Sequence, residues 1–499
     1  MDGPLLAIDR DDARPVGIQL VEGLRRGILD GRLRAGDPVP STRALAGELG
    51  VSRSSVVAAY DQLAGEGYLD VRQGAPTRVA ALVAADPDAA PVGSPDDRPV
   101  TTVDAGPRGA APAPTAGTEP DVGGAGGGEL VLRPGLPSTA RLDERAWRAA
   151  WRHAARLTVP GDIPPDFGAP RLCAEVADHL RHARGVTCDP DDVVVTAGTS
   201  DAVALLASAL RRMVDGTPRV AVEDPGYPSA RRVLERRGAL RAIPVPVDDD
   251  GIDVESLRGI RPAPHAVMVT PSHQYPLGGR LPVASRLALL EWAAEADALV
   301  LEDDYDSEFR HLGAPLPALA SLDRTGHTVL IGSFSKVLTP WLRLGYLVLP
   351  ANPRLRDAVA AVRDDETTPV PGVVQEAMAE LLATGAVRRH IAAVRRDYAH
   401  RRRLVLAALD GIPGAPVSGL DGGLHAVVRL PSEQVAERAV DRLSAEGVAV
   451  TPLAEYAVVP GEGPAGIVIG YGSPSDMQLA RALPRLRAAV EEALAASAG

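Results

Sequence analysis

The sequence has little cysteine, no long apolar run and no apolar leader, and each shortage excludes a class of protein. Two cysteines, Cys173 and Cys188, exclude a disulfide framework and favour a reducing compartment. No uninterrupted apolar stretch reaches the length that spans a membrane. Residues 1–12 hold four aspartates and no apolar core, so no secretory signal is visible. Together these absences predict a cytoplasmic protein with no membrane partner.

Lysine is scarcer still, because Lys336 is the only one among 53 basic residues. Arginine replaces lysine wherever a positive charge suffices, but a guanidinium cannot form an imine with an aldehyde and a primary amine can. Ser333 and Ser335 place hydroxyls beside this amine, and Arg343 follows seven residues later. An amine among hydroxyls and a guanidinium suits an aldehyde that also carries a phosphate, which describes pyridoxal 5′-phosphate (PLP). The sequence predicts PLP as cofactor, and no metal.

At 499 residues the chain is too long for a single core, so two or three domains are expected. The net charge of −12 argues against a protein whose whole surface binds polyanions, but it leaves room for a local nucleic-acid site. The hydrophobic share of 45% and the charged share of 24% are those of an ordinary globular protein.

Residues 13–80 have the pattern of a winged helix-turn-helix. Apolar residues recur at helical spacing over 18–29, and a helix capped by Ser41 ends at Gly50. Ser52 is the expected N-cap of a second helix, and two short alternating runs around residues 73–76 predict a hairpin wing. In a major groove the start of the second helix would meet bases and phosphates. The alternative is a structural three-helix domain with a solvated face.

Residues 81–129 contain eight prolines and nine glycines and no aromatic residue. Such a composition buries too little apolar surface to offset the cost of ordering, so the segment is expected to be a flexible tether and a domain boundary.

Residues 130–499 alternate apolar runs with helical stretches, which predicts an α/β domain with a mainly parallel sheet and flanking helices. The expected strands are residues 193–196, 219–222, 266–269, 299–301 and 328–331. In such a sheet the ligand lies beyond the carboxyl ends of the strands, and polar residues occur at these ends.

Each strand end suits one part of PLP. Gly198, Thr199 and Ser200 open a helix, where backbone N–H groups and the helix dipole favour a phosphate. Asp303 suits the pyridine nitrogen and Tyr305 the phenolic oxygen, whereas Tyr227 suits the face of the ring. His273 and Gln274 are two further polar candidates. Each of these residues could instead have a purely structural role, in a helix cap, a solvated acidic loop or a packed turn. The order of the residues along the sheet, however, suits one cofactor.

These segments resemble known families. The segments around Ser41–Ala46, Gly50–Arg53 and Leu63–Leu69 resemble the GntR-type winged helix-turn-helix, and the segments around Tyr227, His273, Asp303 and Lys336 resemble the fold-type I aminotransferase domain. Fused together they resemble the MocR/GabR group of bacterial transcription regulators. The resemblance implies a smaller C-terminal α+β subdomain, a homodimer and a double-stranded DNA operator. The DNA contacts it implies are Arg43, Arg53, Ser54, Ser55, Gln73 and Gly74.

For the cofactor, the resemblance implies a Schiff base on Lys336, Asp303 at the pyridine nitrogen, Tyr305 at the phenolic oxygen, and Arg343 with Ser333 on the phosphate. The sequence departs from the aminotransferase pattern at Val468, where an arginine that clamps the substrate carboxylate is expected. Arg429 is a nearby arginine whose guanidinium could bind the carboxylate in place of the missing one. Ser229 stands where a GABA-sensing relative has an arginine, so a GABA-type contact is not supported.

The predicted function is a PLP-dependent transcription regulator that senses an amine, an amino acid or PLP itself, with residual or no transaminase activity. The alternative is an active aminotransferase with an accessory DNA-binding domain. The DNA-binding pattern favours the first interpretation, and Val468 weakens the second.

Overall fold

The computed structural model describes residues 8, 10, 16–29, 32–65, 68–70, 76–80, 129–311 and 317–498. The expected tether at 81–129 therefore lies outside the described residues except for its last position. Among the described helices, none is long and apolar enough to cross a membrane.

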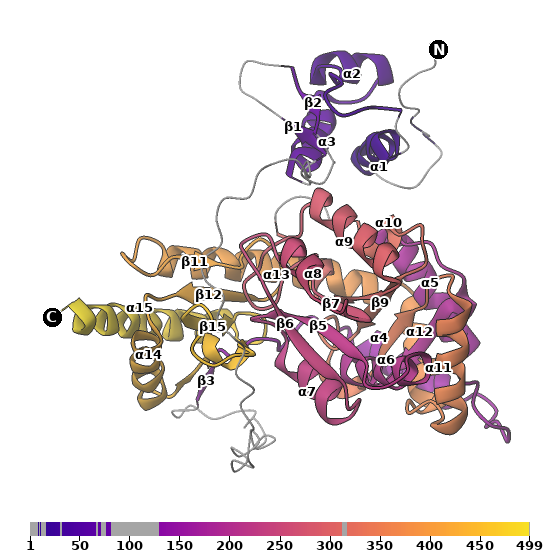
Figure 1. The fold of residues 1–499 in the computed structure, drawn as a ribbon. Helices are drawn as coiled ribbons and strands as arrows, with labels where there is room; N and C mark the ends of the chain where they lie inside the picture. Colours follow the sequence, from indigo (N-terminus) through magenta and orange to yellow (C-terminus); the bar gives the residue numbers. More distant parts are fainter. Residues whose placement is uncertain are drawn as a thin grey trace.

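The N-terminal part has the predicted winged helix-turn-helix elements (Figure 1). Ser41 caps the second helix by accepting a hydrogen bond from the Ala44 N–H at 3.2 Å. Gly50 ends this helix in the left-handed conformation, with φ of 62°. Ser52 Oγ accepts the Ser55 N–H at 3.1 Å, as an N-cap does. The elements are α1 (Val16–Leu29), α2 (Thr42–Leu49), α3 (Arg53–Gly65), β1 (Leu69–Asp70) and β2 (Arg78–Val79).

A seven-stranded sheet forms the centre of the larger part, in the order β4-β10-β9-β8-β7-β5-β6. All five predicted strands are confirmed, and β6 and β10 are additions. β10 pairs antiparallel with both β4 and β9, whereas β5 to β9 pair parallel with one another. The strands are β4 (Val193–Thr196), β5 (Arg219–Asp224), β6 (Arg241–Pro246), β7 (Ala266–Val269), β8 (Leu299–Asp304), β9 (Thr328–Ser333) and β10 (Gly345–Val348).

Helices cover both faces of this sheet because both sets of alternating side chains are apolar. Val220, Met268 and Leu301 pack with one group of helices, and Ala221, Val267 and Val300 pack on the opposite side. The first group is α6 (Thr199–Met213), α7 (Pro228–Arg236) and α11 (Pro353–Asp365). The opposite group is α5 (Pro170–Arg184), α8 (Val254–Gly259), α9 (Val283–Ala296), α10 (Leu319–Leu322), α12 (Gly372–Ala383) and α13 (Ala386–Leu409); α4 (Glu144–Ala154) packs against α12.

A smaller α+β part follows α13 and lies beside the larger one (Figure 1). Its sheet has the order β11-β12-β15-β14 and is covered by α14 (Glu433–Ala445) and α15 (Asp476–Ala498). Its strands are β11 (Val417–Ser418), β12 (His425–Arg429), β14 (Thr451–Pro452) and β15 (Gly466–Gly470). β3 (Leu130–Val131) pairs in parallel with β13 (Val448–Ala449), so residues 130–131 pack with the smaller part although they precede the larger part in the sequence.

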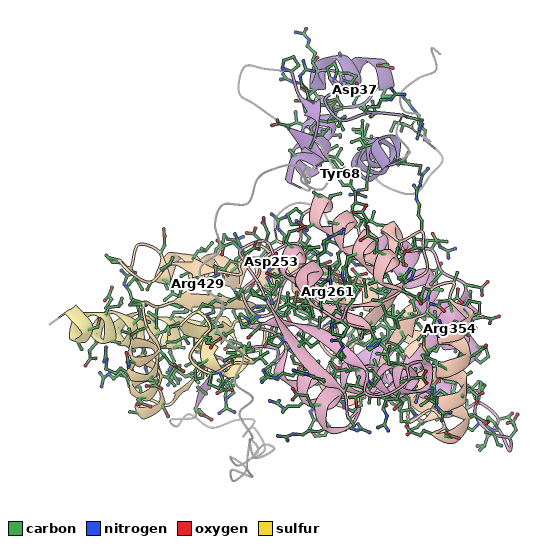
Figure 2. The ribbon with its side chains drawn as sticks, in the orientation of Figure 1. Asp37, Tyr68, Asp253, Arg261, Arg354 and Arg429 are labelled. Carbon is green, nitrogen blue, oxygen red and sulfur yellow. The ribbon has the colours of Figure 1, made fainter. Side chains whose placement is uncertain are left out.

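The winged helix-turn-helix packs on α9. Val283 is fully buried in the same apolar cluster as Leu20, Leu24 and Tyr68, and Leu287 packs against this cluster. Figure 2 shows Tyr68 at the edge of the N-terminal part that faces α9. The apolar core of the DNA-binding part therefore continues onto the surface of the larger part.

Candidate functional site

A cavity of about 310 Å³ lies at the carboxyl ends of the parallel strands. It brings together nine of the eleven residues predicted to bind the cofactor: Thr199, Ser200, Tyr227, Asp303, Tyr305, Ser333, Ser335, Lys336 and Arg343. The other lining residues are Pro134, Gly135, Leu136, Thr270, Tyr275 and Pro340. Residues at the ends of β8 and β9 meet here because the strand ends of one parallel sheet share an edge.

Lys336 follows β9, and its Nζ donates a hydrogen bond to the Gly135 carbonyl at 2.5 Å. Burial lowers the pKa of Lys336, although the charges of Asp303 and Asp306 oppose this shift. A lowered pKa increases the fraction of neutral amine, which is the form that attacks an aldehyde.

Gly135 holds this amine in a turn with φ of 85°, and a Cβ at this position would lie 2.9 Å from Lys336 Nζ. Residues 134–136 were not predicted from the sequence. The signal available for them was the Pro134-Gly135 dipeptide, which marks a turn.

Asp303, at the end of β8, is the buried carboxylate of the cavity. Its Oδ1 is buried and has no hydrogen-bond partner among the described residues. Burial, and then the negative charge of Asp304, raise the pKa of Asp303 to about 8. A buried acceptor without a donor is costly, so this atom fits the protonated ring nitrogen that PLP would present.

The start of α6 and Arg343 form a candidate anion site in the cavity. Gly198 precedes α6, whose first turn contributes Thr199 and Ser200. Arg343 adopts a left-handed conformation, with φ of 45°, and its Nη2 donates to the Ala197 carbonyl at 3.0 Å. The guanidinium therefore lies beside the start of a 15-residue helix, where a phosphate is stabilised by N–H groups, dipole and charge. Gly198 is not itself a lining residue, but an added Cβ would lie 3.7 Å from Arg343 Nη2.

Tyr305 lines the cavity, and its hydroxyl donates to the backbone carbonyl of His273 at 3.0 Å. Burial raises the pKa of Tyr305 and of Tyr227, so both phenols stay protonated at neutral pH. The ring of Tyr227 meets that of Tyr275 edge-on, with centroids 5.9 Å apart.

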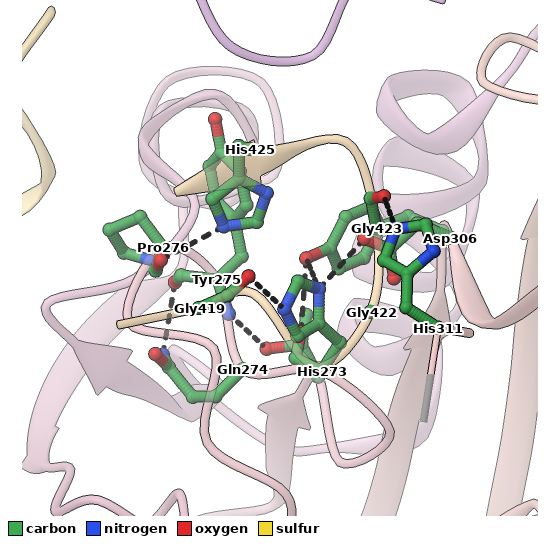
Figure 3. Close-up of polar contacts among 12 residues, drawn as sticks. His273, Gln274, Tyr275, Pro276, Asp306, His311, Gly419, Gly422, Gly423 and His425 are labelled. Carbon is green, nitrogen blue, oxygen red and sulfur yellow. Dashed lines mark hydrogen bonds and ion pairs between the residues drawn. The ribbon is translucent and has the colours of Figure 1, made fainter. Parts of the chain in front are cut away.

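His273 is not a lining residue of the cavity, and its ring centroid is 6.2 Å from that of Tyr305. Figure 3 shows His273 among its polar contacts. Its Nδ1 is 2.8 Å from Asp306 Oδ2, and its Nε2 is 3.2 Å from the Gly419 carbonyl. Burial alone would lower the pKa of His273, but the Asp306 carboxylate raises it. His273 thus contacts both Asp306 and Tyr305. Gln274 Nε2 donates a hydrogen bond to the Pro225 carbonyl at 2.9 Å.

His425, on β12, joins this buried group and was not predicted from the sequence. Its Nε2 is 2.9 Å from the Pro276 carbonyl, and burial lowers the pKa of His425 to about 3. Ligand atoms of His273, Asp306 and His425 lie within 4.8 Å of one another, a distance that a metal ion could bridge. Both nitrogens of His273 are already hydrogen-bonded, so the geometry fits a hydrogen-bond network.

Val468, at the position where a substrate-clamping arginine is expected, is fully buried in an apolar cluster. Its neighbours in the cluster include Val427 and Tyr456, and Tyr275 packs against it. Arg429, labelled on the smaller part in Figure 2, is 3.2 Å from Asp249 and is not a lining residue. The guanidinium in the lining is that of Arg343.

Four of the six predicted DNA contacts lie among the described residues of the winged helix-turn-helix. Arg43 is exposed in the first turn of α2, and Arg53 is exposed at the start of α3. Ser54 and Ser55 follow Arg53, and their hydroxyls lie 2.9 and 2.8 Å from Ser52 Oγ. Gln73 and Gly74 lie outside the described residues.

Known families match both the DNA-binding part and the aminotransferase-like part of the chain. Residues 18–79 match the family described as bacterial regulatory proteins, gntR family, and residues 141–486 match aminotransferase class I and II. The chain is 40% identical to the HTH-type pyridoxine biosynthesis transcriptional regulator PdxR of Corynebacterium glutamicum, over 97% of this chain and 98% of that protein. It is 34% identical to the probable rhizopine catabolism regulatory protein MocR of Rhizobium meliloti, over 97% and 96%.

Among solved structures, the chain resembles the α-aminoadipate aminotransferase LysN of Thermus thermophilus in complex with N-(5′-phosphopyridoxyl)-L-leucine. The TM-score is 0.66 and the identity 28%, and the match covers 74% of this chain and 93% of that one.

Proposed function

Since the chain belongs to the MocR-type transcription regulators, which join a gntR-family DNA-binding domain to a PLP-dependent class I and II aminotransferase domain, we propose that its effector is PLP itself. The PLP-occupied cavity would then set the affinity of the winged helix-turn-helix for its operator. The observation that carries the proposal is Val468, because a site without a carboxylate clamp keeps the cofactor and discriminates poorly among amino acids. The relative at 40% identity is named as a regulator of pyridoxine biosynthesis, which agrees with such an effector.

We propose that the cavity residues hold PLP by its four polar groups. When bound, PLP supplies an aldehyde that condenses with a primary amine and a ring that withdraws electrons. Lys336 provides the amine, and Asp303 accepts the ring N–H with its unbonded Oδ1. Arg343 and the start of α6 take the phosphate, with Ser333 and Ser335 adding hydroxyls. Tyr305 would turn its single O–H from the His273 carbonyl to the phenolic oxygen, and Tyr227 would pack on the ring.

Turnover of amino acids is expected to be slow because nothing in the described lining orients a substrate carboxylate. A carboxylate fork would add two charge-assisted hydrogen bonds, each worth about 1.5–3 kcal/mol. The same contacts orient the Cα–H bond toward Lys336, so their loss slows the chemical step as well as weakening binding.

We also propose a homodimer whose interface lies beside the cavity. Trp341 is 92% exposed, between the lining residues Pro340 and Arg343. Val159 and Ile163 are 88% and 79% exposed, which is unusual for branched apolar side chains. Burial of these residues against a second copy would explain their exposure in one chain. The proposed organisation is a DNA-binding domain at 13–80, a tether at 81–129 and an effector domain at 130–499, acting in the cytoplasm.

A DNA-binding assay with defined ligands tests the effector. Cofactor-free protein is titrated onto a duplex from the region upstream of its own gene, with PLP, with pyridoxamine 5′-phosphate, or with PLP plus a panel of amino acids. PLP alone is expected to change the apparent Kd at least tenfold, and pyridoxamine 5′-phosphate, which lacks the aldehyde, is expected to do less. An effect that requires an amino acid or amine in addition to PLP would overturn the proposal. Sustained turnover with a 2-oxo acid acceptor would restore the aminotransferase interpretation.

A further inference from the structure

The helix α13 is unusually basic for a chain with a net charge of −12. Its 24 residues contain seven arginines and two histidines but a single acid, Asp397. The chain as a whole has 65 acidic and 53 basic residues, so a helix of ordinary composition would carry several acids. α14 shows the ordinary pattern, with Glu433, Glu437 and Asp441 among its arginines.

The arginines of α13 recur with a seven-residue period. Three consecutive blocks read Val387-Arg388-Arg389, Val394-Arg395-Arg396 and Arg401-Arg402-Arg403. The first position of each block is buried. Because seven residues make nearly two turns, the third position of each block points away from the buried side. Arg389, Arg396 and Arg403 therefore form a column on the outer face, and all three are exposed.

Three of the other four arginines of these blocks have structural partners, and the fourth, Arg388, is exposed. Arg395 donates to the Glu308 carbonyl at 3.0 and 2.6 Å, and Arg401 is 3.1 Å from Asp476 Oδ1. Arg402 likewise donates to the Leu420 carbonyl. These contacts tie α13 to its neighbours and account for part of the arginine content.

No such account covers the outer column. Arg389 donates to the Thr384 carbonyl at 2.9 Å, which leaves most of its guanidinium exposed. The outer positions between the three arginines are Ala392, Ala393, Ala399 and His400, so α13 itself places no acid on this face; Asp476 of α15 lies 3.5 Å from His400 Nε2. Asp397, the one acid of the helix, is bound by Arg141 at 2.7 and 3.0 Å. A merely solvated face would normally mix charges of both signs.

We propose that the outer column of α13, namely Arg389, Arg396 and Arg403, binds the phosphate backbone of duplex DNA beyond the segment that the winged helix-turn-helix contacts. Neighbouring arginines in the column are about 10.5 Å apart, which corresponds to about three base pairs along the DNA axis. The whole column spans about 21 Å, or about six base pairs. Small alanines between the arginines let the helix approach the backbone closely.

Duplex DNA is the partner that the chain itself supports. Exposed guanidinium groups match phosphates better than they match a neutral surface. The gntR-family domain brings a polyanion to this molecule, and DNA that continues past the operator is the polyanion at the highest local concentration. The proposal uses only the DNA-binding class of the chain and is independent of which small molecule the cavity senses.

The test compares two charge-matched triple variants in the full chain. The first is Arg389→Gln, Arg396→Gln and Arg403→Gln. The control is Arg236→Gln, Arg237→Gln and Arg241→Gln, three exposed arginines at the end of α7 and the start of β6. Each variant lowers the formal net charge from −12 to −15. Binding to random-sequence duplexes of about 12 and about 60 base pairs is measured as a function of salt, because phosphate contacts appear in the slope.

On the long duplex, the wild-type slope of log Kobs against log salt is expected to exceed that on the short duplex by about 2.7 per chain, at about 0.9 for each of three phosphates. The α13 variant should lose this excess and keep the short-duplex slope, whereas the control should keep both. Circular dichroism and PLP absorbance verify that each variant is folded. An α13 variant that retains the full excess overturns the proposal. A loss that is equal in the control also overturns it, because net charge would then be the cause.

Discussion

Asp303→Asn is expected to raise the stability of the cofactor-free protein and to lower the affinity for PLP. Burial, with the charge of Asp304, raises the pKa of Asp303 from 3.8 to about 8. Between these pH values the folded chain binds one proton more than the unfolded chain, so the free energy of unfolding falls as pH rises. At about 1.36 kcal/mol per pH unit, the interval from 3.8 to 7 corresponds to about 4 kcal/mol.

In cofactor-free protein, Asp303→Asn is therefore expected to be more stable than wild type at pH 7, and to lose this advantage toward pH 4. The buried amide has no partner and costs about 1–3 kcal/mol, so the net gain at pH 7 is about 2 kcal/mol. Urea unfolding followed at pH values from 4 to 8 measures the difference. Identical pH profiles of wild type and variant would refute the assignment of the raised pKa to Asp303.

With PLP the effect reverses, because the neutral amide cannot replace a carboxylate facing a protonated ring nitrogen. A hydrogen bond to a charged group is worth about 1.5–3 kcal/mol, so PLP should bind about 10- to 150-fold more weakly. Glu302→Gln is a matched control. Glu302 precedes Asp303 on β8 and has a pKa raised by burial to about 7, but it accepts the Leu319 and Ala320 N–H groups away from the cavity. Wild-type PLP affinity in Asp303→Asn would show that the carboxylate does not face the ring nitrogen.

Two further predictions concern the amine and the DNA contacts. Lys336→Arg keeps the charge and approximate volume but cannot form an imine, so covalent PLP should vanish while the fold remains; a borohydride-reducible adduct in the purified variant would place the attachment elsewhere. Arg53→Ala and Arg43→Ala should each weaken operator binding by about 1–3 kcal/mol at fixed salt if they make bidentate base contacts. If both variants bound the operator as tightly as wild type, Arg43 on α2 and Arg53 on α3 would not contact DNA.

The residues that the sequence located well are those at strand ends of one parallel sheet. Asp303, Ser333 and Thr199 follow apolar runs that are readable as buried strands, and the shared direction of these strands places their ends together. The direction of β10 was not readable. Its run Gly345–Val348 resembles those of its neighbours, and nothing local distinguishes a strand that pairs antiparallel with both of them.

The residues that the sequence did not locate reach the site through long-range packing. Gly135 lies beside Lys336 because β3 pairs with β13, more than 300 residues later in the chain. His425 comes from the smaller sheet and meets His273 with ring centroids 4.9 Å apart. Such contacts depend on how two parts of the chain dock, and neither periodicity nor a local motif encodes the docking. His273 was predicted at the cofactor, but it is not a lining residue of the cavity, and its Nδ1 is 2.8 Å from Asp306 Oδ2.

The apolar cluster around Val468 connects the missing clamp to the holding of a cofactor. Val468 on β15 pairs with Val427 on β12, and Tyr275 packs against the apolar cluster that contains both. The hydroxyl of Tyr275 is 3.3 Å from that of Tyr456. A guanidinium in this place would be buried without a carboxylate, at a cost of several kcal/mol. An arginine could therefore be accommodated there only if the tyrosines moved and opened the wall to a substrate. In the proposed function, the same packing would keep the phosphate and ring-nitrogen ends of the cavity for PLP and leave no clamp for an amino-acid carboxylate.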